Sequence, residues 1–205
     1  MFRRRERNQR GAVAVEAALV TPVVCLMLFG IVEMSLLMRD VVSASSSVRA
    51  GTRVASASAA AGKCLTSCSP TTAPALAQAA ATAIERSGSA LGEDALQTMI
   101  VYEANANGYP NGRTDADACG GATNCVTYTW DAVADKFSYT SGTWDTTNQV
   151  NACVNDANRD SVGVAIRARH KWVTGLFGNS YTLSERSVMQ FEPLPNENCL
   201  PTKHG

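Results

Sequence analysis

The sequence predicts an α+β protein, in which a long N-terminal transmembrane helix continues into an exported domain with a small antiparallel sheet. Three observations predict this fold: an apolar run near the N-terminus, a stripe of small and apolar residues after it, and alternating apolar residues in the C-terminal half. The composition, 45% hydrophobic and 18% charged, is that of one globular domain with an appendage.

The apolar run is long enough to cross a membrane. Residues 17–38 contain one charged side chain, Glu33, and no Lys or Arg occurs from Gly11 to Met38. A helix of this length covers ~33 Å, against a hydrocarbon core of ~30 Å. Residues 1–10 carry five arginines against one glutamate, whereas acidic groups outnumber Lys and Arg by 15 to 12 from Asp40 onward. We therefore expect a single-pass protein of the cell membrane, with a cytoplasmic N-terminus and an extracytoplasmic C-terminal domain.

A cleavable secretory signal peptide is the competing interpretation of this run. Its apolar region would have roughly 7–15 residues and end at a small-residue cleavage site. Here the run is longer, and Arg39 and Asp40 separate it from the first plausible site, at residues 42–44. A lipoprotein signal fits less well, because Cys25 follows Val24 rather than a small residue. The pattern favours a permanent anchor.

The helix is predicted to continue outside the membrane. No Pro occurs between Val23 and Ser69, and small or apolar residues recur at spacings of three and four. One helix over residues 12–61 would be ~75 Å long. Arg49 and Arg53 lie broadly on another face, as a solvated pair or as salt-bridge partners. The stripe consists of Leu37, Val41, Ala44, Val48, Gly51 and Ala55.

The remaining residues, 62–205, predict an extracytoplasmic α+β domain that follows the basic leader (1–11) and the long helix (12–61). Its last two strands are expected to form an antiparallel hairpin. His170 shares a strand face with Trp172, so a structural role is a simpler interpretation than a role as ligand or base. The connections 105–124 and 141–159 are rich in Gly, Asn, Asp and Thr and are predicted to be exposed. The expected elements are a helix over 73–86 and strands over 98–103, 126–130, 136–140, 162–172 and 181–191.

The cysteines agree with export. Cys25 lies inside the apolar run, and the other six fall in the predicted outer domain, where an oxidising compartment would allow up to three disulfides. Six cysteines permit 15 pairings, so the sequence leaves the connectivity open. The simplest pairing is local, and a zinc site is the less favoured alternative because no C-x-x-C pair occurs. The simplest set is Cys64–Cys68, Cys119–Cys125 and Cys153–Cys199.

Catalytic and cofactor motifs are absent from the sequence. It contains no P-loop, dinucleotide fingerprint, nucleophile elbow or H-E-x-x-H pattern. Residues 156–160 imitate the start of a calcium loop, but Ser161 and Arg167 replace the Gly and Glu that an EF-hand needs. Asp115 and Asp117 form a lone D-x-D pair, which is weak support for calcium. We expect no enzyme activity, no cofactor, no metal site and no nucleic-acid partner.

The residues that open the apolar run, RGAVAVE at 10–16, form the most specific pattern. A charged group deep in a bilayer costs ~2.5–3.5 kcal/mol, so Glu16 calls for a compensating partner. The pattern resembles the leader of type IV pilin-like proteins, in which a basic head ends in a Gly that precedes the cleavage site. That resemblance implies cleavage between Gly11 and Ala12, with Glu16 as the fifth mature residue. Otherwise, Glu16 simply reaches the headgroups near the arginines.

The wider segment resembles the TadE-like family of tight-adherence pilus systems. The likeness rests on the leader, the FGIVE-like segment at 29–33, the Arg-x-Gly-x-Arg segment at 49–53 and a C-terminal Glu192–Pro193 pair. It implies a pilin-like pseudopilin or minor pilin of a Flp-type pilus for surface attachment. The implied partners are a prepilin peptidase, other pilin subunits and the pilus assembly platform. One departure is Ala17, where the main pilins commonly carry an aromatic residue.

Two points stay open at the level of sequence. Glu33 lies ~26 Å along the helix from Glu16, and is either an interfacial side chain or an assembly contact with a neighbouring helix or the platform. The alternative function is a membrane-anchored cell-surface binding module that does not polymerise. The two functions differ in whether assembly depends on Glu16.

Overall fold

The computed structural model describes residues 10–62, 73–87, 91–92, 95–144, 150–175 and 177–194. A long helix, α1 (Arg10–Ala57), leads into a short 3-10 helix, η1 (Ala59–Ala61), and then a second helix, α2 (Ala75–Ser87). Five strands follow, and together they confirm the predicted α+β class. The strands are β1 (Leu96–Glu103), β2 (Cys125–Asp131), β3 (Lys136–Thr143), β4 (Ser161–Lys171) and β5 (Ser180–Gln190).

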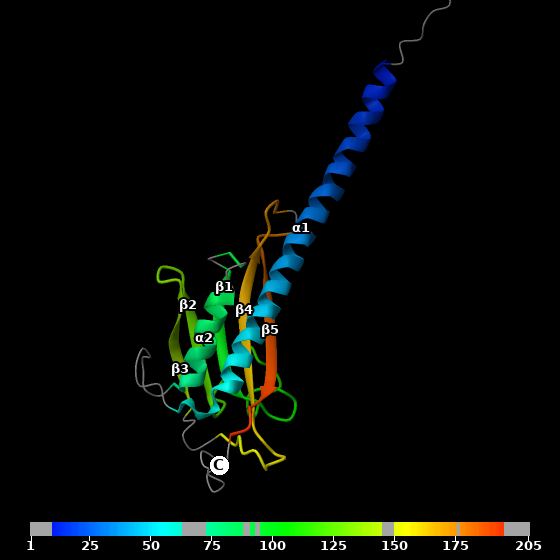
Figure 1. The fold of residues 1–205 in the computed structure, drawn as a ribbon. Coiled ribbons are helices and arrows are strands. Elements are labelled where there is room, and N and C mark those ends of the chain that lie inside the picture. The colour runs from blue at the N-terminus through cyan, green and yellow to red at the C-terminus, as the bar shows by residue number, and fades with distance from the viewer. Residues whose placement is uncertain are drawn as a thin grey trace, which may run out of the picture.

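The strands form one antiparallel sheet in the order β3-β2-β1-β4-β5. Strands β4 and β5 pair over their whole length, from Ser161 opposite Gln190 to Lys171 opposite Ser180, as the predicted hairpin. Both helices lie on the same face of this sheet, with the outer half of α1 across β4 and β5 and α2 nearer to β1 and β3 (Figure 1). The inner half of α1 extends beyond the sheet without touching it.

The core lies between the helices and the sheet. The stripe predicted on α1 is the face that packs there: Ala44, Val48 and Ala55 are fully buried, and Leu37 and Val41 are half-buried against the same cluster. Gly51 faces α2 so closely that an added Cβ would lie 2.7 Å from Ile84 Cγ1. From the sheet come alternate residues of β4, chiefly Val162, Val164, Ile166 and Ala168.

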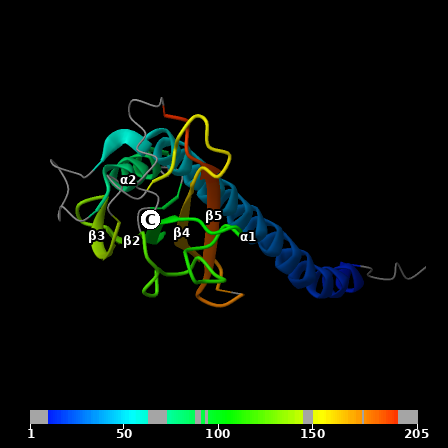
Figure 2. The same ribbon diagram turned by 90° about the horizontal axis from the view of Figure 1, so that it is seen from below.

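The opposite face of the sheet is covered by the connection between β1 and β2 (Figure 2). Tyr102 is buried there against Gly163, whose missing side chain leaves the ring its space. The Tyr102 hydroxyl donates a hydrogen bond to the carbonyl of Gly108, 3.1 Å away. A disulfide between Cys119 and Cys125 ties the same connection to the start of β2.

Several boundaries differ from the sequence-based expectation. α1 stops at Ala57, four residues early, because the chain tightens into η1 and leaves it through Gly62 at φ 64°. The prediction that residues 141–159 form an exposed connection is wrong in part. β3 runs to Thr143, and Trp144 and Ala152 are buried. The reason is a tertiary contact that local polarity hides, because the indole of Trp144 packs edge-on against Phe191, with ring centroids 6.4 Å apart.

Candidate functional site

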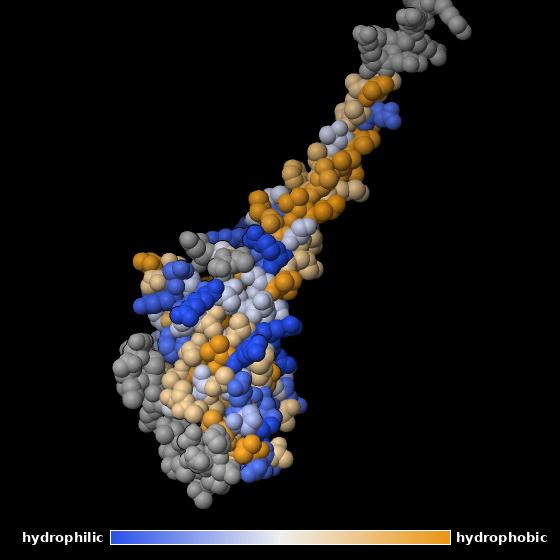
Figure 3. All heavy atoms as spheres, viewed as in Figure 1, coloured by the Kyte–Doolittle hydropathy of each residue, from blue (hydrophilic) through white to orange (hydrophobic). Residues whose placement is uncertain are grey.

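The inner half of α1 is an apolar helix without a protein covering. Its valines, leucines and Phe29 are exposed from Val13 to Val32, and the space-filling view shows them as an apolar rod that leaves a mixed polar head (Figure 3). Within the described residues, one helix, α1, is long and apolar enough to cross a membrane. It is therefore compatible with a single-pass membrane anchor.

The three residues of the predicted processing and assembly site lie at the far end of this rod. Gly11, Ala12 and Glu16 are all helical and exposed, and an added Cβ at Gly11 would meet no atom within 4 Å. Ala12 and Glu16 are one turn apart on the same face, with a rise of ~6 Å between them. No described residue of the head covers this end of the helix, so these groups are open to other molecules.

Glu33 is held by the head domain of its own chain. Its side chain is fully buried, although it follows a run of exposed residues. The carboxylate accepts hydrogen bonds from the Thr174 amide (2.5 Å), the Thr174 hydroxyl (2.7 Å) and the Val173 amide (3.1 Å). Val173 and Thr174 both lie in the turn between β4 and β5. The structure therefore gives this carboxylate an intramolecular partner that the sequence did not identify.

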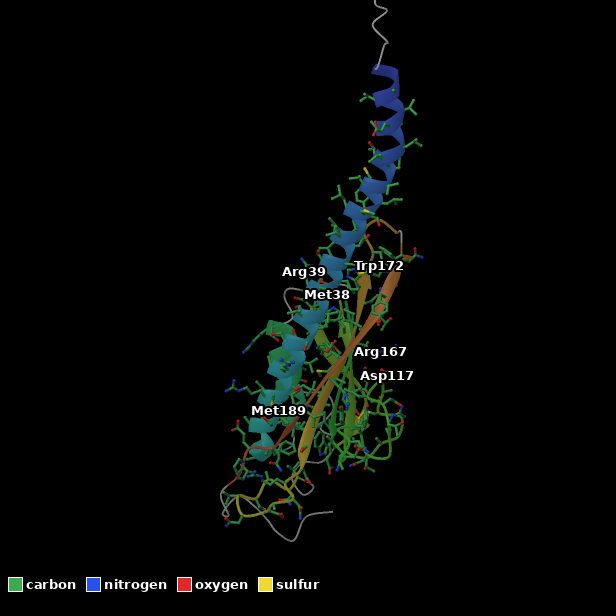
Figure 4. All side chains as sticks on the ribbon, turned by 90° about the vertical axis from the view of Figure 1, so that its right-hand side faces the viewer. Met38, Arg39, Asp117, Arg167, Trp172 and Met189 are labelled. Carbon is green, nitrogen blue, oxygen red and sulfur yellow. A yellow bond between two sulfur atoms is a disulfide. The ribbon has the colours of Figure 1, made fainter. Side chains whose placement is uncertain are left out.

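A second polar contact joins α1 to β4 two turns further out. His170 Nδ1 lies 2.7 Å from Asp40 Oδ2, and both residues are buried. Since the carboxylate can only accept, the ring N–H is the donor. Arg39 approaches the other oxygen of Asp40 at 3.3 Å. Trp172 closes the site from the turn, with its ring 4.7 Å from that of His170 (Figure 4).

An open cleft of about 460 Å³ lies beside this contact, between α1 and the end of β4. Its lining combines apolar and cationic side chains, among them Leu36, Arg39, Arg169, Lys171 and Val173. Among the residues that the structure describes, no group of three or more His, Cys, Asp or Glu side chains is placed to hold a metal ion. The cleft therefore combines charged and apolar surface.

The position of both carboxylates on the packed face of α1 is visible in the sequence. Glu33 and Asp40 continue the 3–4 spacing of the stripe that begins at Leu37, so they lie on the face that meets the sheet. A charged residue on the buried face of a helix requires a partner, because its desolvation is otherwise uncompensated. The identity of that partner depends on the sheet, which brings residues about 130 positions away to the helix.

Of the three predicted disulfides, the structure describes both cysteines of one. Cys119 and Cys125 are bonded, with an S–S distance of 2.07 Å, as one of the simplest local pairs would be. Cys153 is also in a disulfide, whereas Cys25 is free. Cys64, Cys68 and Cys199 lie outside the described residues, so the other two predicted pairings are outside them too.

The N-terminal segment of the chain is similar to a known protein family. Residues 11–53 match the family described as TadE-like protein. Neither the curated proteins nor the solved structures gave a match to the chain. The matched segment contains the predicted processing residues Gly11 and Ala12, the carboxylates of Glu16, Glu33 and Asp40, and most of the packed stripe. The chain therefore carries a TadE-like segment at residues 11–53, as its leader and its FGIVE-like segment had indicated.

Proposed function

We propose that this protein is a TadE-like pseudopilin or minor pilin that takes part in the assembly of a tight-adherence pilus, and that its role is structural rather than catalytic. The observation that carries the proposal is the division of α1. One continuous helix has an inner half suited to lipid or to neighbouring helices and an outer half built into a folded head. The TadE-like match over residues 11–53 covers both halves and links this design to Tad pilus systems.

Processing and assembly would use the exposed end of α1. A prepilin peptidase would cut after Gly11 and leave a charged amine on Ala12. The Glu16 carboxylate of a neighbouring subunit would then pair with that amine as the helices pack side by side. At ~4 Å and an effective dielectric of 20, such a pair attracts by about 4 kcal/mol before desolvation is subtracted. This pairing would fix the axial register between subunits.

The head and the bare helix would then serve different partners. The apolar rod would first anchor the subunit in the membrane and later pack among the helices of other subunits at the assembly platform. Small residues such as Gly30, which has open space around it, would allow close helix approach. The head would stay on the extracytoplasmic side, where its disulfides are stable.

Two measurements on cells that make the pilus test the proposal. Intact mass of the membrane-extracted protein should show a chain that begins at Ala12. Glu16→Ala should abolish or strongly reduce pili seen by electron microscopy, while surface labelling shows the head still exported. Val133→Ala, at an exposed residue of the turn between β2 and β3 and away from α1, is the control and should leave pili unchanged. A chain that keeps its first eleven residues while pili form normally would contradict the proposal. Normal pili with Glu16→Ala would favour the non-polymerising surface module.

A further inference from the structure

The turn between β4 and β5 exposes large apolar side chains. We call residues 172–175 and 177–179 the hairpin tip. Val173 is 74% exposed and Phe177 is 51% exposed, and Trp172 packs against Phe177 with ring centroids 5.4 Å apart. In Figure 1 this turn extends along α1 toward its inner half, beyond the other end-turns of the sheet.

The contact with Glu33 fixes the depth of the hairpin tip. Glu33 precedes Met38, the last residue of the apolar run, by five residues, which is about 7.5 Å of helix rise. Val173 and Thr174 bond directly to its carboxylate, so the tip lies at the level of residue 33 rather than below residue 38. When α1 spans a bilayer, this level is at or just inside the outer edge of the hydrocarbon region.

We propose that the hairpin tip is a second membrane contact, inserted into the outer interface of the bilayer beside α1. At about the level of the tip, Met34 and Met38 on α1 are also exposed, so the helix offers further apolar surface at this depth. The proposal rests on the membrane anchor in the proposed function, but not on pilus assembly.

The chemistry of the tip suits this location. Its amides at Val173 and Thr174 donate to Glu33, and those at Trp172 and Gly178 donate to the carbonyls of Asn179 and Gly175. Backbone donors that are bonded within the protein can enter a region of low polarity at a much smaller cost. The Glu33 carboxylate is likewise supplied with three donors at a depth where water is scarce.

Charged residues lie just below the apolar tip, where headgroups would be. Figure 4 shows Trp172 beside α1 near the level of Met38 and Arg39. Arg39, Arg169 and Lys171 line the cleft that opens there, and all three are exposed. An apolar edge, then a tryptophan, then cations is the order that a protein surface shows across a membrane interface with anionic lipids. These observations favour lipid over a protein partner at the tip.

Photolabelling from lipid tests the inference on the full-length protein. The protein would be reconstituted at low density in phosphatidylcholine–phosphatidylglycerol vesicles that contain a lipid with a diazirine in its acyl chain. Labelled peptides would be mapped by mass spectrometry. We expect adducts on residues 11–38 of α1 and on the hairpin tip. Val154, exposed in the β3–β4 connection at the opposite end of the sheet, is the internal control and should carry none.

A double variant sharpens the test. Val173→Asp with Phe177→Asp should lower tip labelling on the order of tenfold, because each charge opposes insertion. Val154→Asp should change nothing. Adducts on α1 without any on the wild-type tip would overturn the inference and leave the anchor in place; a tip that contacts a second copy instead of lipid would give this result. Absence of adducts on α1 as well would overturn both the inference and the anchoring part of the proposed function.

Discussion

The two halves of α1 belong to one continuous helix and meet different surroundings. From Val13 to Val32 the large apolar residues point outward on all sides. From Glu33 to Ala57 the buried apolar residues lie on the face that meets the sheet and α2, while others such as Met38 and Val42 stay exposed. The inner half carries no positional pattern because lipid can solvate every side of a helix. The outer half keeps a stripe because only one side is covered by protein.

The change between the halves occurs within about two turns. Glu33 and Asp40 are the first charges on the covered face, and both are bonded to residues at the end of β4 or in the turn after it. Their partners couple the orientation of the head to the helix at the junction between the two halves. A head tethered only through the flexible end of a helix would lack this coupling. The comparison predicts that changes in the outer half alter the fold of the head and that those in the inner half do not.

The largest expected effect is the difference between removing the inner half of α1 and removing the whole of α1. A fragment of residues 30–205 should remain a soluble folded monomer, because it keeps Glu33 and the whole packed stripe. A fragment of residues 58–205 should fail to fold, because it loses the buried Ala44, Val48 and Ala55 that cover β4 and β5. Circular dichroism and NMR dispersion of both fragments, purified under oxidising conditions, check this. Cooperative folding of the shorter fragment would contradict the division.

A smaller effect is expected from single valines. Val48→Ala should lower the free energy of unfolding of the head by about 2 kcal/mol, because two buried methyl groups are replaced by a cavity. Val20→Ala, in the exposed half, should change it by less than about 0.5 kcal/mol. Denaturant unfolding of the full-length proteins in a mild detergent measures both. Equal effects would show that the inner half supports the head.

Gly51 and Gly30 in α1 form a matched pair, in which only the first substitution is expected to change head stability. A methyl group at Gly51 would lie 2.7 Å from Ile84 Cγ1 and 3.3 Å from the Ala80 carbonyl oxygen, whereas at Gly30 it would meet nothing within 4 Å. Gly51→Ala should destabilise the head by about 1 kcal/mol, since the overpacking exceeds the gain in helix propensity. Gly30→Ala should leave head stability unchanged. Stabilisation by Gly51→Ala, in the same detergent assay, would mean that α2 moves aside freely.

Local pattern predicted the helices and strands well. The stripe on α1, the apolar run and the alternation in β4 are periodic, and periodicity reports which face is covered. The TadE-like segment was recognisable because its leader and the FGIVE-like residues are local too. The β4–β5 hairpin followed from two adjacent strands with a glycine-containing turn.

Contacts between distant segments were not predictable in this way. The burial of Trp144 depends on Phe191, 47 residues later, and the partner of Asp40 is 130 residues away. Glu33 looked like an interfacial or intermolecular residue because no local residue could satisfy it. Its donors come from a turn that reaches the helix only after the sheet has formed. The predicted processing residues Gly11 and Ala12 and the predicted assembly residue Glu16 are exposed at the end of α1, so no contact within the described head tests the roles proposed for them.

The most localised effect is expected at the junction between the halves. Glu33→Ala removes the acceptor for the Val173 and Thr174 amides, so their hydrogen exchange should accelerate on the order of tenfold, which corresponds to about 1.4 kcal/mol of lost protection. Glu33→Gln keeps one acceptor oxygen and should give a smaller acceleration, and Glu16→Ala should give none because Glu16 lies far from the head. Exchange followed by mass spectrometry on the full-length protein in detergent measures all three. If the turn stayed protected in Glu33→Ala, sheet pairing alone would hold it, and Glu33 would be free for a contact with a neighbouring subunit.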